Sequence, residues 1–288
     1  MGPQAHLLPG GDRLHLQHGP IDLVIGADGQ RSRAFEAAHA RFGTVLAELV
    51  AELPRLREPL NDKSAKPHGI IAARMHAAVA PFVSIGHLTR MAAVAGAVAD
   101  EVLHAMVDAA RLERAYVNNG GDIALHLAEG QVFRMAISDH TGRVLGQIAL
   151  TRGDGIAGIA TSGRHGRSHS LGIADSATVL ARSAAAADAA ATLIANAVDL
   201  PGHPGVNRCP AHMLDDNTDL GAQPVVTHCA PLSHADCRTA LQSGLARAAS
   251  FKKDRRIEAA ALFLQNHSAV TGRTLSALQL QPKEAEHA

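Results

Sequence analysis

The alternation of apolar and polar residues near the start of the chain predicts a β-hairpin. Leu14 and Leu16 alternate with polar residues, and Ile21, Leu23 and Ile25 repeat the alternation after a His-Gly-Pro turn. Successive side chains of a strand point to opposite faces, so this spacing gives each strand one apolar face. The chain is therefore expected to open with paired strands.

Apolar residues three or four positions apart predict two helices in the first half of the chain. One run extends from about Ser32 to Leu53 and is expected to stop at Pro54, and the other extends from about Gly86 to Ala110. This spacing places the apolar side chains on one stripe of a helix. The proline-rich segment 54–69 between them predicts a polar, exposed loop.

Five short alternating runs follow the second helix. They read RAYVNN, DIALHLAEG, QVFRMAISD, RVLGQIALTRG and GIAGIATSG, and Gly- or Asp-containing turns separate them, which predicts a consecutive antiparallel meander. The alanine-rich segment 183–200 predicts a helix that ends before Pro201-Gly202. After an irregular stretch to about Pro231, a helix capped by Ser233 and a final strand at 257–265 are expected. Residues 281–288 are expected to be a frayed tail.

This order of elements predicts the fold class. Strands, helices and turns do not alternate regularly as β-α-β units, which argues against a doubly wound parallel sheet. We expect a single α+β domain over residues 1–288, with helices packed on a largely antiparallel sheet.

The composition of the chain disfavours several classes of function. The chain has 288 residues, of which 47% are hydrophobic and 19% charged, as expected of a globular protein. Lys plus Arg equals Asp plus Glu at 27 each, so there is no net positive field for nucleic acid or an anionic membrane. Aromatic residues make up 2%, which disfavours base stacking. With no signal-peptide pattern and three cysteines, a reducing, cytoplasmic location is expected.

The segment VNNGGDIALHL offers two interpretations. Asn119, Gly120, Gly121 and Asp122 are typical of a tight turn between strands, because Gly and Asn tolerate positive φ. The same backbone N–H groups could also cradle a phosphate, with Asp122 beside them to hold a cation or a ligand hydroxyl. Taken alone, the stretch favours the turn.

Two further segments carry candidate site residues. Thr161, Ser162 and Gly163 end an apolar strand just before Arg and His residues, a pattern that fits either an anion site or a solvated loop. Asp188 and Thr192 are four residues apart and so share one helix face, where they could bind a hard cation such as Mg²⁺ or face solvent.

Two other patterns are weaker indications of a binding site. Residues 153–158 match G-x-G-x-x-G, but a strand-like run follows where a dinucleotide site needs a helix. Six His and Cys residues within a short span could bind zinc, although their spacing matches no standard finger. They are Cys209, His212, His228, Cys229, His234 and Cys237.

Three segments together resemble the ApbE-like flavin transferases, in the same order along the chain. They are 92–125 with its Gly-Gly-Asp, GIATSG at 158–163 and ADAAAT at 187–192, within a resemblance that covers roughly 85–200. The chain is more similar still to a shorter cytoplasmic branch of uncharacterised ApbE-like proteins, with which it shares TDLGAQPVVT and ALQSGLARAA. An ApbE-like, T-fold-like α+β domain is expected.

The resemblance also implies an activity and a site. Family enzymes bind FAD and Mg²⁺, cleave the pyrophosphate and attach FMN to a threonine of an acceptor protein. Asp188 and Thr192 would hold the metal, and the backbone around 94–96 would add a carbonyl. The cofactor-binding residues would be Gly96, Asn119, Gly120, Gly121, Asp122, Thr161, Ser162 and Gly163. His169 or Asp175 would be the catalytic base.

The chain departs from the family pattern in two places. Val94-Ala95-Gly96 stands where the transferases have Ala-Lys-Gly, and HSLGIADS replaces the His-x-x-Asp-Pro segment. The alternative to a transferase is therefore a binding module for a flavin, pterin or other phosphorylated cofactor. A zinc-stabilised interaction protein ranks last. The Ala- and Val-rich helices make a homodimer plausible.

Overall fold

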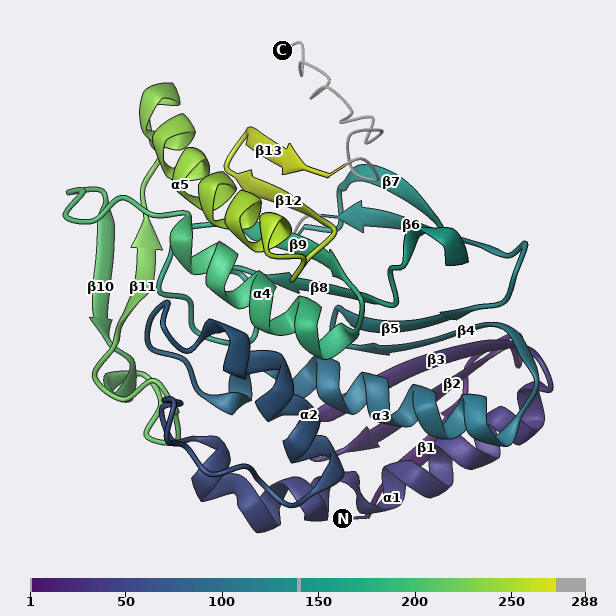
Figure 1. Ribbon diagram of the computed structural model, residues 1–288. Helices are drawn as coiled ribbons and strands as arrows, with labels where there is room; N and C mark the ends of the chain where they lie inside the picture. Colours follow the sequence, from purple (N-terminus) through teal and green to yellow (C-terminus); the bar gives the residue numbers. More distant parts are fainter. Residues whose placement is uncertain (1, 139–140, 273–288) are drawn as a thin grey trace.

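One nine-stranded antiparallel sheet organises the molecule (Figure 1). The computed structural model describes residues 2–138 and 141–272. In order across the sheet the strands are β1 (Gln4–Leu7), β2 (Arg13–His18), β3 (Ile21–Gly29), β4 (Leu112–Asn119), β5 (Asp122–Leu127), β8 (Gly158–Ser162), β9 (Ser176–Ala181), β12 (Ala259–Leu264) and β13 (His267–Thr271). All neighbouring pairs in this order are antiparallel.

Helices cover one face of this sheet, and a β-hairpin covers part of the other. The helices are α1 (Arg31–Leu56), α2 (Ile70–Val79), α3 (Val94–Ala109), α4 (Ala184–Ala197) and α5 (His234–Lys253), and the hairpin is β6 (Val132–Ser138) and β7 (Val144–Thr151). The larger apolar cluster lies between helices and sheet, and a smaller one lies between sheet and hairpin. The α+β class and the antiparallel sheet predicted from the sequence are confirmed.

The predicted hairpin and helices are present, with shifted ends. β2 and β3 pair as expected, but α1 continues through Pro54 to Leu56. A proline in the last turn removes one backbone hydrogen bond, and the complete burial of Leu56 offsets that loss. α3 begins at Val94 rather than near 86, because Thr89 caps a 3₁₀ turn over Arg90–Ala93.

The predicted consecutive meander is wrong. β8 pairs directly with β5, and β6 and β7 leave the sheet to form their own two-stranded unit. Ile137, Ile148 and Leu150 of this unit are buried against the face of the sheet that the helices leave open. The alternation in a strand predicts that one of its faces is apolar, but not which part of the molecule covers that face. The sequence therefore could not distinguish a consecutive meander from a separate hairpin packed on the sheet.

Several elements were not predicted. α2 carries Ile71, Met75 and Val79 four residues apart, in a segment after the predicted loop to which no element was assigned. All six residues of β9 are buried, so this strand shows no alternation. The expected irregular stretch contains the hairpin of β10 (Val206–Pro210) and β11 (Pro224–Cys229), and β13 follows the expected final strand. The predicted tail at 281–288 lies outside the described residues.

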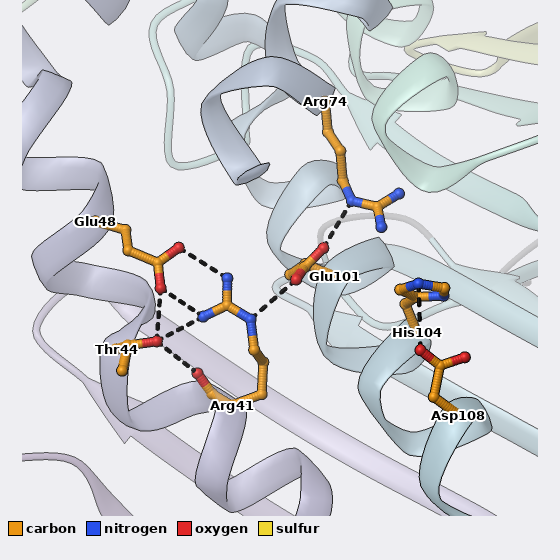
Figure 2. A network of polar contacts seen from close by, with 7 residues as sticks. All are labelled: Arg41, Thr44, Glu48, Arg74, Glu101, His104 and Asp108. Atoms are coloured by element: carbon orange, nitrogen blue, oxygen red, sulfur yellow. Dashed lines mark hydrogen bonds and ion pairs between the residues drawn. The ribbon is translucent and has the colours of Figure 1, made fainter. Parts of the chain in front are cut away.

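An ion-pair network centred on the buried Glu101 joins the first three helices (Figure 2). Arg41 Nε on α1 and Arg74 Nε on α2 donate to the two carboxylate oxygens of Glu101 on α3, at 2.9 and 2.8 Å. Arg41 also pairs with Glu48. Burial raises the pKa of Glu101, but hydrogen bonds from both arginines outweigh it and leave that pKa lowered. The network therefore holds α1 and α2 against α3, whose first turn contributes to the site described below.

Candidate functional site

Helices α3 and α4 cross closely at their N-terminal ends. A Cβ atom at Gly96 would overlap the Ala184 carbonyl, and one at Gly158 on β8 would overlap the backbone of Ser183. Both positions therefore require glycine. The Ser183 hydroxyl accepts from the Ala186 N–H and caps α4. These close approaches bring the starts of two helices to the same place beside β5 and β8.

Each of the two helices supplies a carboxylate to the N-terminal end of the other. The Gly96 N–H on α3 donates to Asp188 Oδ2 of α4 at 3.0 Å. In return, the N–H groups of Ala184 and Ala185 on α4 donate to the two oxygens of Asp100 on α3, both at 2.9 Å. The first N–H groups of a helix lack intrahelical partners and attract negative charge. The reciprocal contacts therefore fix the relative position of α3 and α4.

A tight glycine turn brings a third carboxylate to this junction. Asn119 pairs with Asp122 across Gly120 and Gly121, whose φ values are 65° and 111°. The Gly121 N–H donates to Asn118 Oδ1 at 2.8 Å, and Asn119 Nδ2 donates to the Ala95 carbonyl at 3.1 Å. The turn predicted from VNNGGD is confirmed. Its connection to the first turn of α3 places Asp122 next to the Asp188 end of the site.

Asp122 and Asp188 form an electrostatically coupled pair. Burial raises the pKa of Asp122 to about 7, opposed by the Thr161 N–H and the Arg167 guanidinium. Burial and the nearby Asp122 charge raise the pKa of Asp188 well above its ordinary range, opposed by the backbone N–H groups of Gly96 and Ala95. Two carboxylates that resist simultaneous ionisation favour a shared proton or a bound cation.

Arg167 contributes positive charge beside the glycine turn. Its guanidinium lies so close to Gly120 that a Cβ atom there would overlap it, and Nη1 donates to the Pro20 carbonyl at 3.4 Å. The sequence indicated a cationic segment after Gly163 without distinguishing its arginines. The structure separates them, since Arg164 pairs with Asp175 and Arg167 lies by the turn.

The Thr-Ser-Gly segment ends β8 beside Asp122. The Thr161 N–H donates to Asp122 Oδ1 at 3.3 Å, and the hydroxyls of Thr161 and Thr178 lie 2.9 Å apart. Gly163 is needed because a Cβ atom there would overlap the Asp175 backbone. Thr161 is exposed and Ser162 half-buried, so both hydroxylated residues are at the accessible end of the strand.

The two predicted catalytic residues occupy different surroundings. One oxygen of Asp175 accepts from Arg164 Nε at 2.9 Å and contacts His165, and the other accepts from the Gln265 N–H. These bonds join the 164–175 segment to the β12–β13 turn. His169 is exposed, and no hydrogen bond within the described residues links it to Asp122 or Asp188. The catalytic role of each remains a prediction.

The predicted metal residues share a helix face as expected. Thr192 lies one turn after Asp188 on α4 and is half-buried, and its hydroxyl makes no hydrogen bond within 2–138 and 141–272. No cluster of three or more His, Cys, Asp or Glu side chains suited to a metal forms in the described part of the chain. The cysteine cluster is thus not brought together as a zinc site, and its three cysteines are free thiols.

The fold with this site at a helix junction defines an ApbE-like protein. The chain belongs to the family described as AbpE bacteria, whose model matches residues 5–273. The resemblance inferred from the Gly-Gly-Asp, Thr-Ser-Gly and Ala-Asp-Ala segments is therefore confirmed. None of the helices in the described ranges combines the length and apolar character needed to cross a membrane.

Archaeal relatives and a solved structure agree with this assignment. The chain is 33% identical over 183 residues to a UPF0280 protein of Methanopyrus kandleri, covering 61% of this chain and 69% of the relative. It is 41% identical over 126 residues to a UPF0280 protein of Methanothrix thermoacetophila, covering 40% of this chain and 48% of the relative. The apo flavinyl transferase ApbE of Pseudomonas stutzeri shares the fold, with a TM-score of 0.51, 13% identity and coverage of 96% and 98%.

Proposed function

We propose that this protein binds FAD with Mg²⁺ at the Asp122–Asp188 site and transfers FMN to a hydroxyl of an acceptor protein. The observation that carries this proposal is the pair of carboxylates with raised pKa values, held between the α3–α4 junction and the glycine turn. The flavinyl transferase ApbE of Pseudomonas stutzeri shares the fold, which supports a flavin nucleotide as the ligand.

The donor atoms suit a hard cation. Asp188 and Thr192 would hold Mg²⁺, and Asp122 lies close enough to raise the pKa of Asp188 by its charge. The Ala95 carbonyl, which already accepts from Asn119, adds another oxygen at the same junction. Mg²⁺ prefers oxygen ligands and keeps waters or substrate phosphates in its remaining positions. When bound, it would neutralise negative charge on the pyrophosphate.

The glycine turn and its neighbours would hold the nucleotide. Gly120 and Gly121 allow close approach of a phosphate, while Arg167 supplies a cation on the same side. This arginine offers a charge that the Val94-Ala95-Gly96 segment lacks. Gly96, Asn119 and the Thr161-Ser162-Gly163 strand end complete the proposed pocket.

The proposed transfer is a displacement at phosphorus. The acceptor hydroxyl oxygen would attack the phosphorus of the FMN half of FAD, and the bond to the AMP phosphate would break, releasing AMP. The hydroxyl proton would pass to a base, for which His169 and Asp175 are the candidates. Asp175 would first have to weaken its contact with Arg164, whereas the exposed His169 needs no such change.

Titration of ligand-free protein with FAD, with and without Mg²⁺, tests this proposal. With a threonine-containing peptide supplied as the acceptor hydroxyl, we expect Mg²⁺-dependent binding, AMP release, a flavin-labelled peptide and loss of all three in Asp188→Asn. Asp108→Asn is the matched control, because Asp108 is an exposed carboxylate near the end of α3. Equal AMP release by Asp188→Asn and wild type would refute the assigned site, provided that both variants remain folded.

A binding module without transfer chemistry is the second candidate. The absence of a lysine at 94–96 and the engagement of Asp188 with the Gly96 N–H favour it. Such a protein would carry a flavin, a pterin or another phosphorylated cofactor. Tight FAD binding without AMP release or a flavin-labelled acceptor would support this function over the transferase.

A further inference from the structure

A separate cavity lies at the opposite ends of the strands that form the site. It has a volume of about 550 Å³ and opens between β2, β3, β4 and the start of β6. Arg114 and Tyr116 line it from β4, whereas Asn119 at the far end of the same strand contacts α3. Tyr116 packs with the β6–β7 cluster, so its side chain is on the other face of the sheet. This cavity is thus distinct from the Asp122–Asp188 site.

The cavity carries an excess of positive charge. Its charged lining consists of four arginines and two aspartates: Arg13, Arg31, Arg114, Arg134, Asp12 and Asp28. Guanidinium groups remain protonated at all relevant pH values. The lining therefore has two more guanidinium groups than carboxyl groups. A phosphate monoester carries about −1.5 to −2 charges at neutral pH, which matches this excess.

The arginines are not equally available to a ligand. Arg114 and Arg31 share Asp28, with Arg114 Nη2 at 2.6 Å and Arg31 Nη2 at 3.4 Å from its oxygens. Arg13 has a long ion pair, with its Nε 4.0 Å from Asp12, and its side chain also contacts the Tyr116 hydroxyl. Arg134 is exposed and forms no ion pair with any of the described residues. Arg13 and Arg134 therefore carry the charge that an anion could neutralise.

Two aromatic rings accompany these arginines. The centroids of Tyr116 and Phe133 are 5.8 Å apart at an interplanar angle of 58°, and both residues are half-buried. Gly26 makes this arrangement possible, because a Cβ atom there would overlap the Tyr116 ring. Aromatic side chains pack favourably against another ring at such separations. Charge and ring surface thus lie in one cavity of ligand size.

We propose that this cavity is a second binding site, for a small phosphate monoester that carries an aromatic ring. The phosphate would be held by Arg13 and Arg134, and the ring would pack on Tyr116 and Phe133. Arg31 and Arg114 keep their ion pairs with Asp28 and form part of the cavity wall. The proposal does not depend on flavin transfer, because none of these residues contributes to the Asp122–Asp188 site.

The composition of the chain provides a local probe. Tyr116 is the single tyrosine and there is no tryptophan, so intrinsic tyrosine fluorescence reports on this cavity alone. Phenyl phosphate is the test ligand, and inorganic phosphate and phenol separate the contributions of charge and ring. Because phenol and phenyl phosphate themselves absorb near the tyrosine band, calorimetry measures their affinities, and tyrosine emission is read for inorganic phosphate. We expect saturable binding of phenyl phosphate, weaker binding of inorganic phosphate and no saturation with phenol.

Substitutions then identify the residues. Arg134→Ala should weaken phenyl phosphate binding about tenfold or more, the usual loss for one charge-assisted hydrogen bond, and Arg13→Ala should have a similar effect. Arg238→Ala is the control, since it removes an exposed arginine of α5 far from the cavity. Absence of saturable phenyl phosphate binding in wild type, or equal affinity in Arg134→Ala and Arg238→Ala, would overturn the proposal. Circular dichroism checks that each variant is folded.

Discussion

Replacing Asp122 by Asn should stabilise the protein most at alkaline pH. Burial raises the pKa of Asp122 from an ordinary value of 3.8 to about 7. Between these values the native state retains a proton that the unfolded chain has released. The free energy of unfolding of the wild type therefore falls as pH rises from about 4 to about 7. Asn has no proton to lose, so the variant should lose this part of the pH dependence.

The magnitude follows from the two pKa values. A difference of one pH unit corresponds to 1.36 kcal/mol, so a shift from 3.8 to about 7 gives an upper limit of about 4 kcal/mol. Partial exposure of Asp122 allows solvent to reduce this cost. We expect the stability gain of Asp122→Asn to be about 2 to 4 kcal/mol larger at about pH 8 than at about pH 4.

Urea unfolding at both pH values measures this difference. A chelator must be present, because a divalent cation would replace the proton and stabilise the ionised pair. Adding Mg²⁺ at about pH 8 should then raise the free energy of unfolding of wild type more than that of Asp122→Asn. Asp108→Asn serves as the control for loss of an exposed carboxylate.

Parallel pH profiles would refute the electrostatic reasoning. If Asp122→Asn and wild type lose the same free energy of unfolding between about pH 4 and about pH 8, Asp122 does not hold a raised pKa. A variant less stable than wild type at about pH 8 would show that the Thr161 N–H contact outweighs the cost of burying the charge.

Three further substitutions test the framework around the site. Gly96→Ala should lower the free energy of unfolding by about 1–3 kcal/mol in urea, because its Cβ overlaps Ala184. Gly43→Ala, at an exposed position of α1 with open space around it, should raise it by about 0.5–1 kcal/mol. Similar effects of both would contradict the close helix crossing. Asp100→Ala should cost about 1–3 kcal/mol, since two N–H groups of α4 lose their acceptor, and unchanged thermal stability would contradict this. Glu101→Ala should lower the free energy of unfolding in urea by about 3 kcal/mol, and Asp108→Ala by about 0.5 kcal/mol or less. Equal losses in the two variants would argue against an ion-pair network around a buried Glu101.

Much of the architecture follows from local patterns in the sequence. Alternating Leu and Ile residues predict β2 and β3, and the apolar stripe of α1 predicts that helix to within three residues at either end. Strand β9 cannot be predicted from alternation, because all six of its residues are buried and both of its faces carry small or apolar side chains. The separate β6–β7 hairpin cannot be predicted from local patterns either. Whether two strands join the main sheet or pack on it depends on which face of the sheet the helices leave uncovered.

The site could be predicted only in part. Asp122 and Asp188 are candidates from their own segments as well as from the family resemblance, but their proximity follows only from the fold. The role of Asp100 could not be predicted, because nothing in the sequence distinguishes it from Glu101 and Asp108 on the same helix as an acceptor for the N–H groups of another helix. The surroundings of Asp175 were likewise unpredictable, since Gln265 lies 90 residues away in sequence.

The exchange of carboxylates between α3 and α4 has a consequence for folding. The bonded positions are separated by 92 residues in one contact and 84 in the other, so neither helix can form its final N-terminal end before the other has docked. Contacts of such high sequence separation are costly to close and form late. The amides of Gly96, Ala184 and Ala185 should consequently exchange with solvent as one cooperative unit. A molecule with one helix undocked has no assembled carboxylate pair, so binding at the proposed site would require that both helices have docked.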